Sequence, residues 1–215
     1  MKKILLSIFT LVFVVNYVGF GAAIAETKVV HDDILLVNEI NKELEKMGRN
    51  QRITLDDLPT ANELNKAMQQ INVSKDNPQQ SIKINDKVLI EAEVYSVTSD
   101  RVSLNSTGQE ETATGTIRMK VLGVNVFSLT VSVTFTYDGQ KILTHQDPPS
   151  ATASAFVGYS ADVTHKDIVD LSPSAKDAIA DAEYQYLKIG GTNVGHIQLR
   201  FTGTGNYYVH NSYFN

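Results

Sequence analysis

The stretch from Gly123 to Lys141 reads GVNVFSLTVSVTFTYDGQK, and it decides the fold class of the chain. Large apolar residues occupy every second position from Leu129 to Tyr137, and threonine or serine occupies the positions between them. Side chains along a β-strand point alternately to opposite faces. The pattern therefore predicts a long strand with one face toward a core and one face that is polar.

Turn signals on both sides of this strand predict antiparallel neighbours. Upstream, TGTIRMKV (residues 114–121) also alternates, so a hairpin turn is expected near Gly123–Asn125. Downstream, Asp138-Gly139 is typical of a type I′ turn, in which both central residues have positive φ. The returning strand would then be QKILTH, residues 140–145.

More short strands follow from the same alternation. They are KVLIEAEVYSVTS (87–99), SATASAFVGYSADV (150–163), HIQLRFTGTG (196–205) and NYYVHNSYF (206–214). The segment from Ser174 fits two structures: Ser174 and Asp177 could cap a helix, but residues 182–189 alternate, and we favour a strand there. Many short strands with Gly-rich turns predict a mainly β fold, an antiparallel β-sandwich with a small β-barrel as the alternative.

Two amphipathic helices are predicted ahead of the strands. In HDDILLVNEINKELEKMGRN (31–50), one helical face carries Ile34, Val37, Ile40, Leu44 and Met47, and Gly48 ends the pattern. In LPTANELNKAMQQI (58–71), Thr60 and Glu63 form a capping box. We expect a helical N-terminal segment at 26–73, a linker at 74–81 and an antiparallel β domain at 82–215.

The start of the chain has the features of an export signal. Lys2 and Lys3 precede an apolar run (4–18), and AIA (23–25) supplies the small residues that signal peptidase recognises. We expect residues 1–25 to be removed as a signal peptide and the mature chain to be secreted, with an uncleaved membrane anchor as the alternative. No membrane span is expected after cleavage.

The composition excludes several kinds of chemistry and of partner. The 215-residue chain has no cysteine, so disulfides, thiolate metal sites and cysteine nucleophiles are excluded. The leader carries two of the 19 basic residues and none of the 24 acidic residues, so the mature chain would have a net charge of −7. Because an acidic surface repels phosphate backbones, we expect no nucleic-acid partner.

No cofactor site, metal site or catalytic group is predicted. The five histidines lack the spacing of metal ligands. His145 and His165 have aspartates nearby, which acid-rich stretches produce by chance. A glycosidase needs two convergent carboxylates, and their convergence cannot be read from a sequence. The acids considered are Glu91, Glu93, Glu110, Glu111, Asp162, Asp167 and Glu183.

An aromatic cluster near the end of the chain is the candidate binding surface: Tyr207, Tyr208, Tyr213 and Phe214. Exposed tyrosines on a β face offer a large contact area for sugars or proteins at low entropic cost. The alternative is that alternate members of the cluster pack in the core. The loops around residues 158–170 are the second place where we expect a working surface.

The segment TGTIRMKVLGVNVFSLTVSVTFTYDGQKI, followed by GYS and TGTGNYYV, resembles uncharacterised secreted β-domains of Gram-positive bacteria. The resemblance covers about Thr112 to Val209 and rests on strand and turn patterns. It implies secretion, a sandwich-like fold and a Gram-positive source. It implies no activity and no role for any residue.

These observations favour a non-enzymatic secreted module that binds a cell-envelope polymer or another protein, at the cell surface or in the medium. One alternative is a hydrolase of cell-envelope polymers, with a site that only the fold assembles. Another is a secreted toxin or antimicrobial protein. A deep pocket with two facing carboxylates, or with a histidine–acid pair, would favour the hydrolase.

Overall fold

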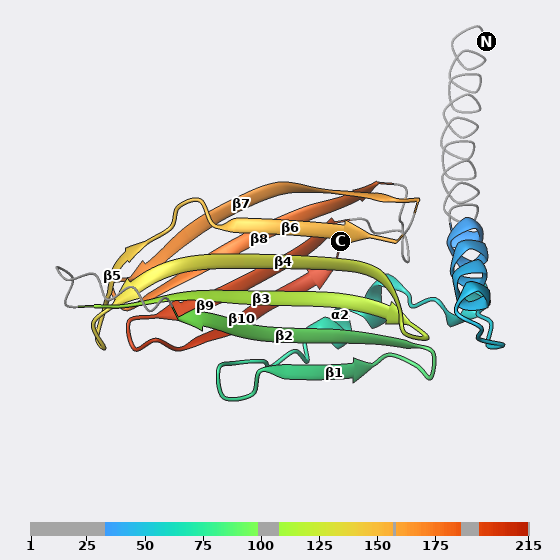
Figure 1. Cartoon of the computed structure of the whole chain (residues 1–215), viewed down its shortest axis with the longest axis horizontal. Coiled ribbons are helices and arrows are strands. Elements are labelled where there is room, and N and C mark those ends of the chain that lie inside the picture. Colours follow the sequence, from blue (N-terminus) through green and yellow to red (C-terminus); the bar gives the residue numbers. More distant parts are fainter. Residues whose placement is uncertain (1–32, 99–107, 157, 186–193, 215) are drawn as a thin grey trace, which may run out of the picture.

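A computed structural model of the protein describes residues 33–98, 108–156, 158–185 and 194–214. Within these residues, two antiparallel sheets lie one in front of the other (Figure 1). The first sheet has the strand order β1-β2-β3-β4-β5, with β6 also paired to β4, and the second has the order β10-β9-β8-β7. The predicted mainly β fold, an antiparallel sandwich behind a short helical segment, is confirmed.

The elements occupy the following residues. The six-stranded sheet contains β1 (Gln79–Lys83), β2 (Val88–Thr98), β3 (Gln109–Val121), β4 (Val124–Tyr137), β5 (Ile142–His145) and β6 (Ser150–Ala155). The four-stranded sheet contains β7 (Ser160–Ser172), β8 (Ala175–Gln185), β9 (Val194–Thr202) and β10 (Tyr207–Phe214). Ahead of the strands lie a helix over residues 33–46, the 3-10 helix η1 (Leu55–Asp57) and the helix α2 (Ala61–Met68).

The core lies between the two sheets and is built on the alternation of β4. Its apolar residues from Leu129 to Phe135 are buried, as predicted. Aromatic rings join the sheets: the ring centroid of Phe127 lies 4.7 Å from that of Phe214 and 5.4 Å from that of Tyr184. The Tyr184 hydroxyl donates to the carbonyl oxygen of Ser128 at 2.9 Å, so its polar atom is also satisfied.

The two turns that flank β4 differ from each other. Leu122 and Gly123 connect β3 to β4, and both have positive φ (49° and 82°), as a type I′ turn requires. The strained backbone of Leu122 is held because its N–H donates to the carbonyl of Lys87 at 2.7 Å and its carbonyl accepts from Arg49. The predicted hairpin near Gly123 is therefore present.

The type I′ turn predicted at Asp138-Gly139 is wrong, although the predicted hairpin forms. Tyr137 pairs with Ile142, which leaves a four-residue loop, and Gly139 has positive φ while Asp138 does not. The physical reason is the Asp138 carboxylate, which accepts from the N–H groups of Gln140 and Lys141 at 2.9 and 2.8 Å. Side-chain caps of this kind stabilise a longer loop.

Three further predictions need correction along β6, β7 and β8. The single strand expected over residues 150–163 is two strands, β6 and β7, which belong to different sheets. The loops expected around residues 158–170 are mostly β7, whose polar and charged side chains had suggested a loop. The helix alternative from Ser174 is also wrong, because β8 runs from Ala175 to Gln185; residues 186–189 lie outside the described part.

Both predicted helical stretches contain helices. In the first helix, Val37, Ile40 and Leu44 are buried as predicted, but Ile34 and Met47 are exposed because they lie at its two ends. The capping box of α2 is present, with Thr60 and Glu63 bonded to each other in both directions. None of the helices in the described ranges is long and apolar enough to span a membrane.

The stretch 74–81, predicted as the linker, lies against the sandwich, and β1 begins inside it. The N–H of Lys75 donates to the carbonyl of Tyr207 at 3.0 Å, and the N–H of Val209 donates to the carbonyl of Val73 at 3.1 Å. These bonds cover the outer edge of β10.

Candidate functional site

The four aromatic residues of the predicted binding surface do not share one face. Tyr207 and Phe214 are buried in the core, whereas Tyr208 and Tyr213 are half-buried on the outer face of the four-stranded sheet. Adjacent residues of a strand point to opposite faces, and the β-bulge at His210, where one extra residue shifts the register between Val209 and Asn211, makes Tyr207 and Phe214 the inward pair. Tyr207 and Phe214 therefore pack in the core, as the alternative had it, and the two outward tyrosines remain as candidates.

The ring of Tyr213 packs against a histidine that is itself paired with an aspartate. In register across three strands lie Asp181 on β8, His196 on β9 and Tyr213 on β10. The Nδ1 atom of His196 is 2.6 Å from Oδ1 of Asp181, and its ring stacks on that of Tyr213 with centroids 4.4 Å apart and planes 10° apart. Asp181 thus orients the imidazole, and the imidazole holds the tyrosine ring.

Tyr208 is supported in a similar way, two rows farther along the same face of these strands. Asp177 on β8 pairs in register with Arg200 on β9, and Arg200 with Tyr208 on β10. Arg200 donates to both carboxylate oxygens of Asp177 at 2.7 and 2.8 Å, and Gln198 donates to one of them at 2.6 Å. The guanidinium carbon lies 6.0 Å from the centroid of the Tyr208 ring.

The electrostatics of this second row fix Arg200 in its charged form. The hydrogen bonds to Asp177 raise the pKa of Arg200 above its ordinary value, although partial burial acts in the opposite direction. The Asp177 side chain is 0% exposed, so its charge is neutralised within the protein. We call this group the tyrosine face; it consists of Tyr208, Tyr213, His196, Gln198, Arg200, Asp177 and Asp181.

The His196–Asp181 pair has the form of a general base with its orienting carboxylate. A base must reach a substrate or a nucleophile, but His196 is only 7% exposed and Tyr213 covers one face of its ring. Among the residues that the structure describes, no group of three histidines or acids could hold a metal ion. The geometry therefore suits support of an aromatic surface better than proton transfer.

The other sequence candidates lie mainly on β7 and β8. His165 pairs in register with Asp181, and His145 lies with its ring edge toward Phe201, 6.3 Å between centroids. Asp162 on β7 pairs in register with Glu183 on β8, whereas Asp167 lies farther along β7 and Glu110 lies on β3.

Two other candidate carboxylates lie together at a shallow hollow of about 270 Å³ on the six-stranded sheet. Glu91 and Glu93 line it, but both are ion-paired with Arg118, and Glu91 also lies 2.7 Å from the ammonium of Lys120. Paired carboxylates in an open hollow do not match the acid–base pair of a glycosidase.

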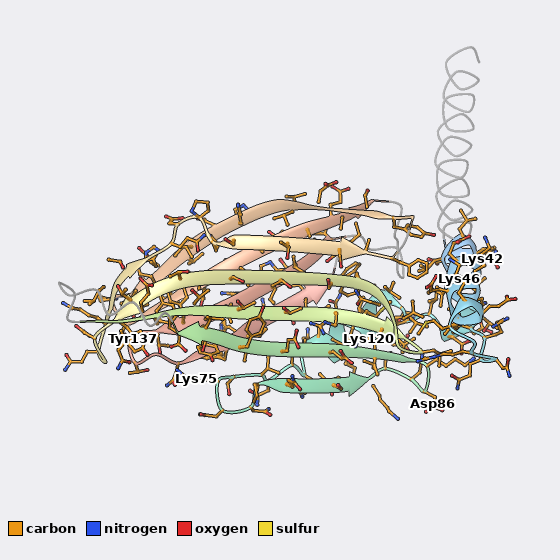
Figure 2. All side chains as sticks on the ribbon, viewed as in Figure 1. Lys42, Lys46, Lys75, Asp86, Lys120 and Tyr137 are labelled. Carbon is orange, nitrogen blue, oxygen red and sulfur yellow. The ribbon has the colours of Figure 1, made fainter. Side chains whose placement is uncertain are left out.

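Glu111 is the one candidate acid that is buried on the inner face, at the end of the sandwich where Lys75 and Tyr137 lie (Figure 2). The ammonium of Lys75 donates to both carboxylate oxygens of Glu111 at 3.1 and 3.2 Å. The Tyr137 hydroxyl donates to one of the same oxygens at 3.3 Å. Burial lowers the pKa of Lys75, but the bond and charge of Glu111 outweigh it, so the pKa is raised. Burial, with the charge of Glu111, raises the pKa of Tyr137. This group joins the stretch 74–81 to the sandwich.

Sequence reasoning missed the carboxylates that organise the tyrosine face. Asp177 and Asp181 are four residues apart on β8, as are His196 and Arg200 on β9. In an antiparallel pair with the right register, this equal spacing brings both acids opposite both partners. The signal was present in the sequence, but it becomes visible only once β8 and β9 are known to be neighbours.

Comparisons of the chain with protein-family models, with curated proteins and with solved structures found no match. Its function is therefore argued from its own residues.

Proposed function

We propose that the protein is a secreted, non-enzymatic binding module that holds a carbohydrate chain of a cell envelope against its tyrosine face. The observation that carries the proposal is the support beneath Tyr208 and Tyr213. Each ring contacts a basic side chain of β9, and each basic side chain is bound by a carboxylate of β8. Sugar rings stack on aromatic rings of this kind.

The support beneath the tyrosines lowers the cost of binding. An aromatic ring that is already held in place loses little freedom when a ligand stacks on it. Between the two tyrosines, His210 and Asn211 are exposed on β10, and Gln198 lies beside them on β9. Their polar atoms can hydrogen-bond sugar hydroxyls, so the tyrosine face combines a stacking surface with hydrogen-bonding groups.

The charge of the protein limits the classes of polymer that are expected to bind. The net charge of the full chain is −5, and the basic residue of the tyrosine face is neutralised by Asp177. Polyanionic polymers are therefore disfavoured, and uncharged glycans are the expected ligands.

The binding test uses isothermal titration calorimetry with soluble oligosaccharides, both β-linked glucans and N-acetylhexosamine chains. Tyr208→Ala with Tyr213→Ala should weaken binding by roughly tenfold or more, since stacking is lost. The matched control is Tyr208→Phe with Tyr213→Phe, which keeps both rings and should retain most of the affinity. Equal affinity of the alanine variant and the native protein would contradict the proposal, as would a native protein that binds none of these glycans.

Secretion is tested separately. Expression in a Gram-positive host should release a protein whose first residue is Glu26, as read by N-terminal sequencing. A chain that keeps residues 1–25 and stays with the membrane would instead show that the leader is an anchor.

A further inference from the structure

The outer face of the six-stranded sheet, opposite the tyrosine face, is an ordered array of hydroxyl groups. Successive outward positions on β3, β4 and β6 are threonine or serine, and they lie side by side in register. Their oxygens form cross-strand pairs: Thr112 with Thr134 at 2.8 Å, Thr114 with Ser132 at 2.8 Å, Thr116 with Thr130 at 2.9 Å, and Ser128 with Ser154 at 2.7 Å. We call these residues, together with Ser150 and Thr152 of β6, the hydroxyl face.

The pairing fixes the positions of the hydroxyl groups but does not satisfy all of their hydrogen-bonding capacity. A hydroxyl can donate one hydrogen bond and accept two, so each pair keeps unused capacity. Thr114 and Thr116 are buried, whereas Thr130 and Ser132 on β4 are half-buried and the hydroxyl residues of β6 are exposed. The hydroxyl groups nearest to solvent are therefore those of β4 and β6, and the ion pair of Glu93 with Arg118 borders them on the side of β2 and β3.

An aromatic ring and a hollow adjoin the hydroxyl face on β2. Tyr95 pairs in register with Thr114 and is 50% exposed, and Val97 beside it is 63% exposed. The hollow of about 270 Å³ lies next to Tyr95 along β2, at Glu91 and Glu93, and extends to β1 and to Arg118 of β3. Its walls include Gln79, Gln80, Ser81, Glu91, Glu93 and Arg118, and the two acids are balanced by Arg118 and by Lys120, which is ion-paired with Glu91.

We propose that the hydroxyl face, with Tyr95 and the hollow, is a second binding site, for an uncharged, hydroxyl-rich polysaccharide. Tyr95 supplies a stacking surface, and the paired hydroxyls supply donors and acceptors for sugar hydroxyls in place of water. The charged groups at the edge of this site are ion-paired with one another, so they offer no free counter-charge to an ionic polymer, and complementarity selects neutral chains. With sites on opposite faces, one molecule could hold two chains and gain affinity through avidity.

The test measures adsorption of the purified protein to insoluble cellulose, chitin and β-1,3-glucan, by depletion from solution. Measurements are made in the Tyr208→Ala/Tyr213→Ala background, so that the tyrosine face cannot contribute. Adding Tyr95→Ala should weaken adsorption by roughly tenfold, as expected for loss of one stacking ring. Thr152→Arg should weaken it as well, because a long charged side chain covers part of the hydroxyl face.

The matched control is Gln140→Arg, which adds the same charge to the exposed β4–β5 loop and should leave adsorption unchanged. Circular dichroism and thermal unfolding establish that each variant is folded. The second site is supported if the Tyr208→Ala/Tyr213→Ala protein still adsorbs and if adding Tyr95→Ala abolishes that adsorption. This outcome does not depend on whether the tyrosine face binds glycans. Adsorption that vanishes with Tyr208 and Tyr213 alone, or that Tyr95→Ala and Thr152→Arg leave unchanged, overturns it. A dimer that Thr152→Arg dissociates in sedimentation experiments would also overturn it, because a second copy would then cover the face.

Discussion

Asn65 on α2 forms two hydrogen bonds with the backbone of Phe214 at the end of β10. Its amide nitrogen donates to the Phe214 carbonyl and its amide oxygen accepts from the Phe214 N–H, both at 2.8 Å. The side-chain amide thus takes the place of a neighbouring strand. An uncovered strand edge invites pairing with other chains, so this contact gives the helical segment a structural purpose.

The first prediction concerns this contact. Asn65→Ala leaves both backbone groups of Phe214 without their partner and should lower the free energy of unfolding by about 1–3 kcal/mol. Urea denaturation followed by tyrosine fluorescence measures the change. Asn38→Ala is the control, because Asn38 is exposed on the helix over residues 33–46 and the same substitution there should cost far less. Similar losses for both variants would show that the Asn65 contact is unimportant.

A second prediction compares two glycines with positive φ. Gly139 (φ 92°) has open space around it, whereas a Cβ on Gly205 (φ 76°) would lie 2.4 Å from the ring of Tyr137. Gly139→Ala should therefore cost about 1 kcal/mol for the backbone alone. Gly205→Ala adds a steric clash and should cost at least about 3 kcal/mol. Thermal denaturation of the two variants separates the effects, and equal melting temperatures would contradict the placement of Tyr137 over Gly205.

The strands could be predicted from the sequence wherever one face is buried. From Leu129 to Phe135 the alternation is regular, because the inner positions must be apolar and the outer positions face water. Most of β7 was not predicted as a strand, because it is an edge strand with little burial on either face. Apolar and polar residues therefore do not alternate regularly along it. The turn at Asp138 was predicted from a dipeptide, but a side-chain cap decided its length.

The candidate site was only half visible in the sequence. Tyr207 and Phe214 are seven residues apart, so regular alternation would place them on opposite faces, yet the bulge at His210 turns both inward. A bulge has no dependable sequence signal. The support by Asp177 and Asp181 depends on strand register, which is set by contacts between β8 and β9 rather than by either strand alone.

Glu111 is predicted to depend on Lys75 for its charge compensation. Lys75→Met removes the ammonium but keeps most of the apolar side chain, and leaves a buried carboxylate without its ion pair. The expected loss is about 3 kcal/mol in the free energy of unfolding. Adding Glu111→Gln removes the buried charge and should restore part of the loss. A double variant that is as unstable as Lys75→Met alone would show that the charge of Glu111 is not the cause.

The helical segment should lose stability in acid. The hydrogen bond from Lys87, with that from the Thr54 N–H, lowers the pKa of Asp57 below its ordinary 3.8, and the Thr60 N–H lowers the pKa of Glu63 below 4.5. Because the folded pKa values are depressed, this stabilisation is complete above about pH 5 and is lost as the pH falls through the folded values. Denaturation midpoints measured from about pH 7 to 2.5 should decline below pH 4. Asp57→Asn should flatten the decline, whereas Asp86→Asn, at an exposed position, should not.

The last prediction concerns the fork between Arg200 and Asp177, the pair of hydrogen bonds from the guanidinium to the two carboxylate oxygens. Arg200→Lys keeps the positive charge but loses the planar bidentate geometry of the guanidinium, and Asp177 has no access to water that could replace a lost bond. The expected cost is about 2 kcal/mol in the free energy of unfolding. Arg52→Lys is the control, because its pair with Glu45 is exposed and the same change should cost under about 0.5 kcal/mol. If the fork also supports Tyr208, Arg200→Lys should weaken oligosaccharide binding in calorimetry while Arg52→Lys leaves it unchanged. A loss of stability with unchanged binding would show that Tyr208 keeps its position without this support.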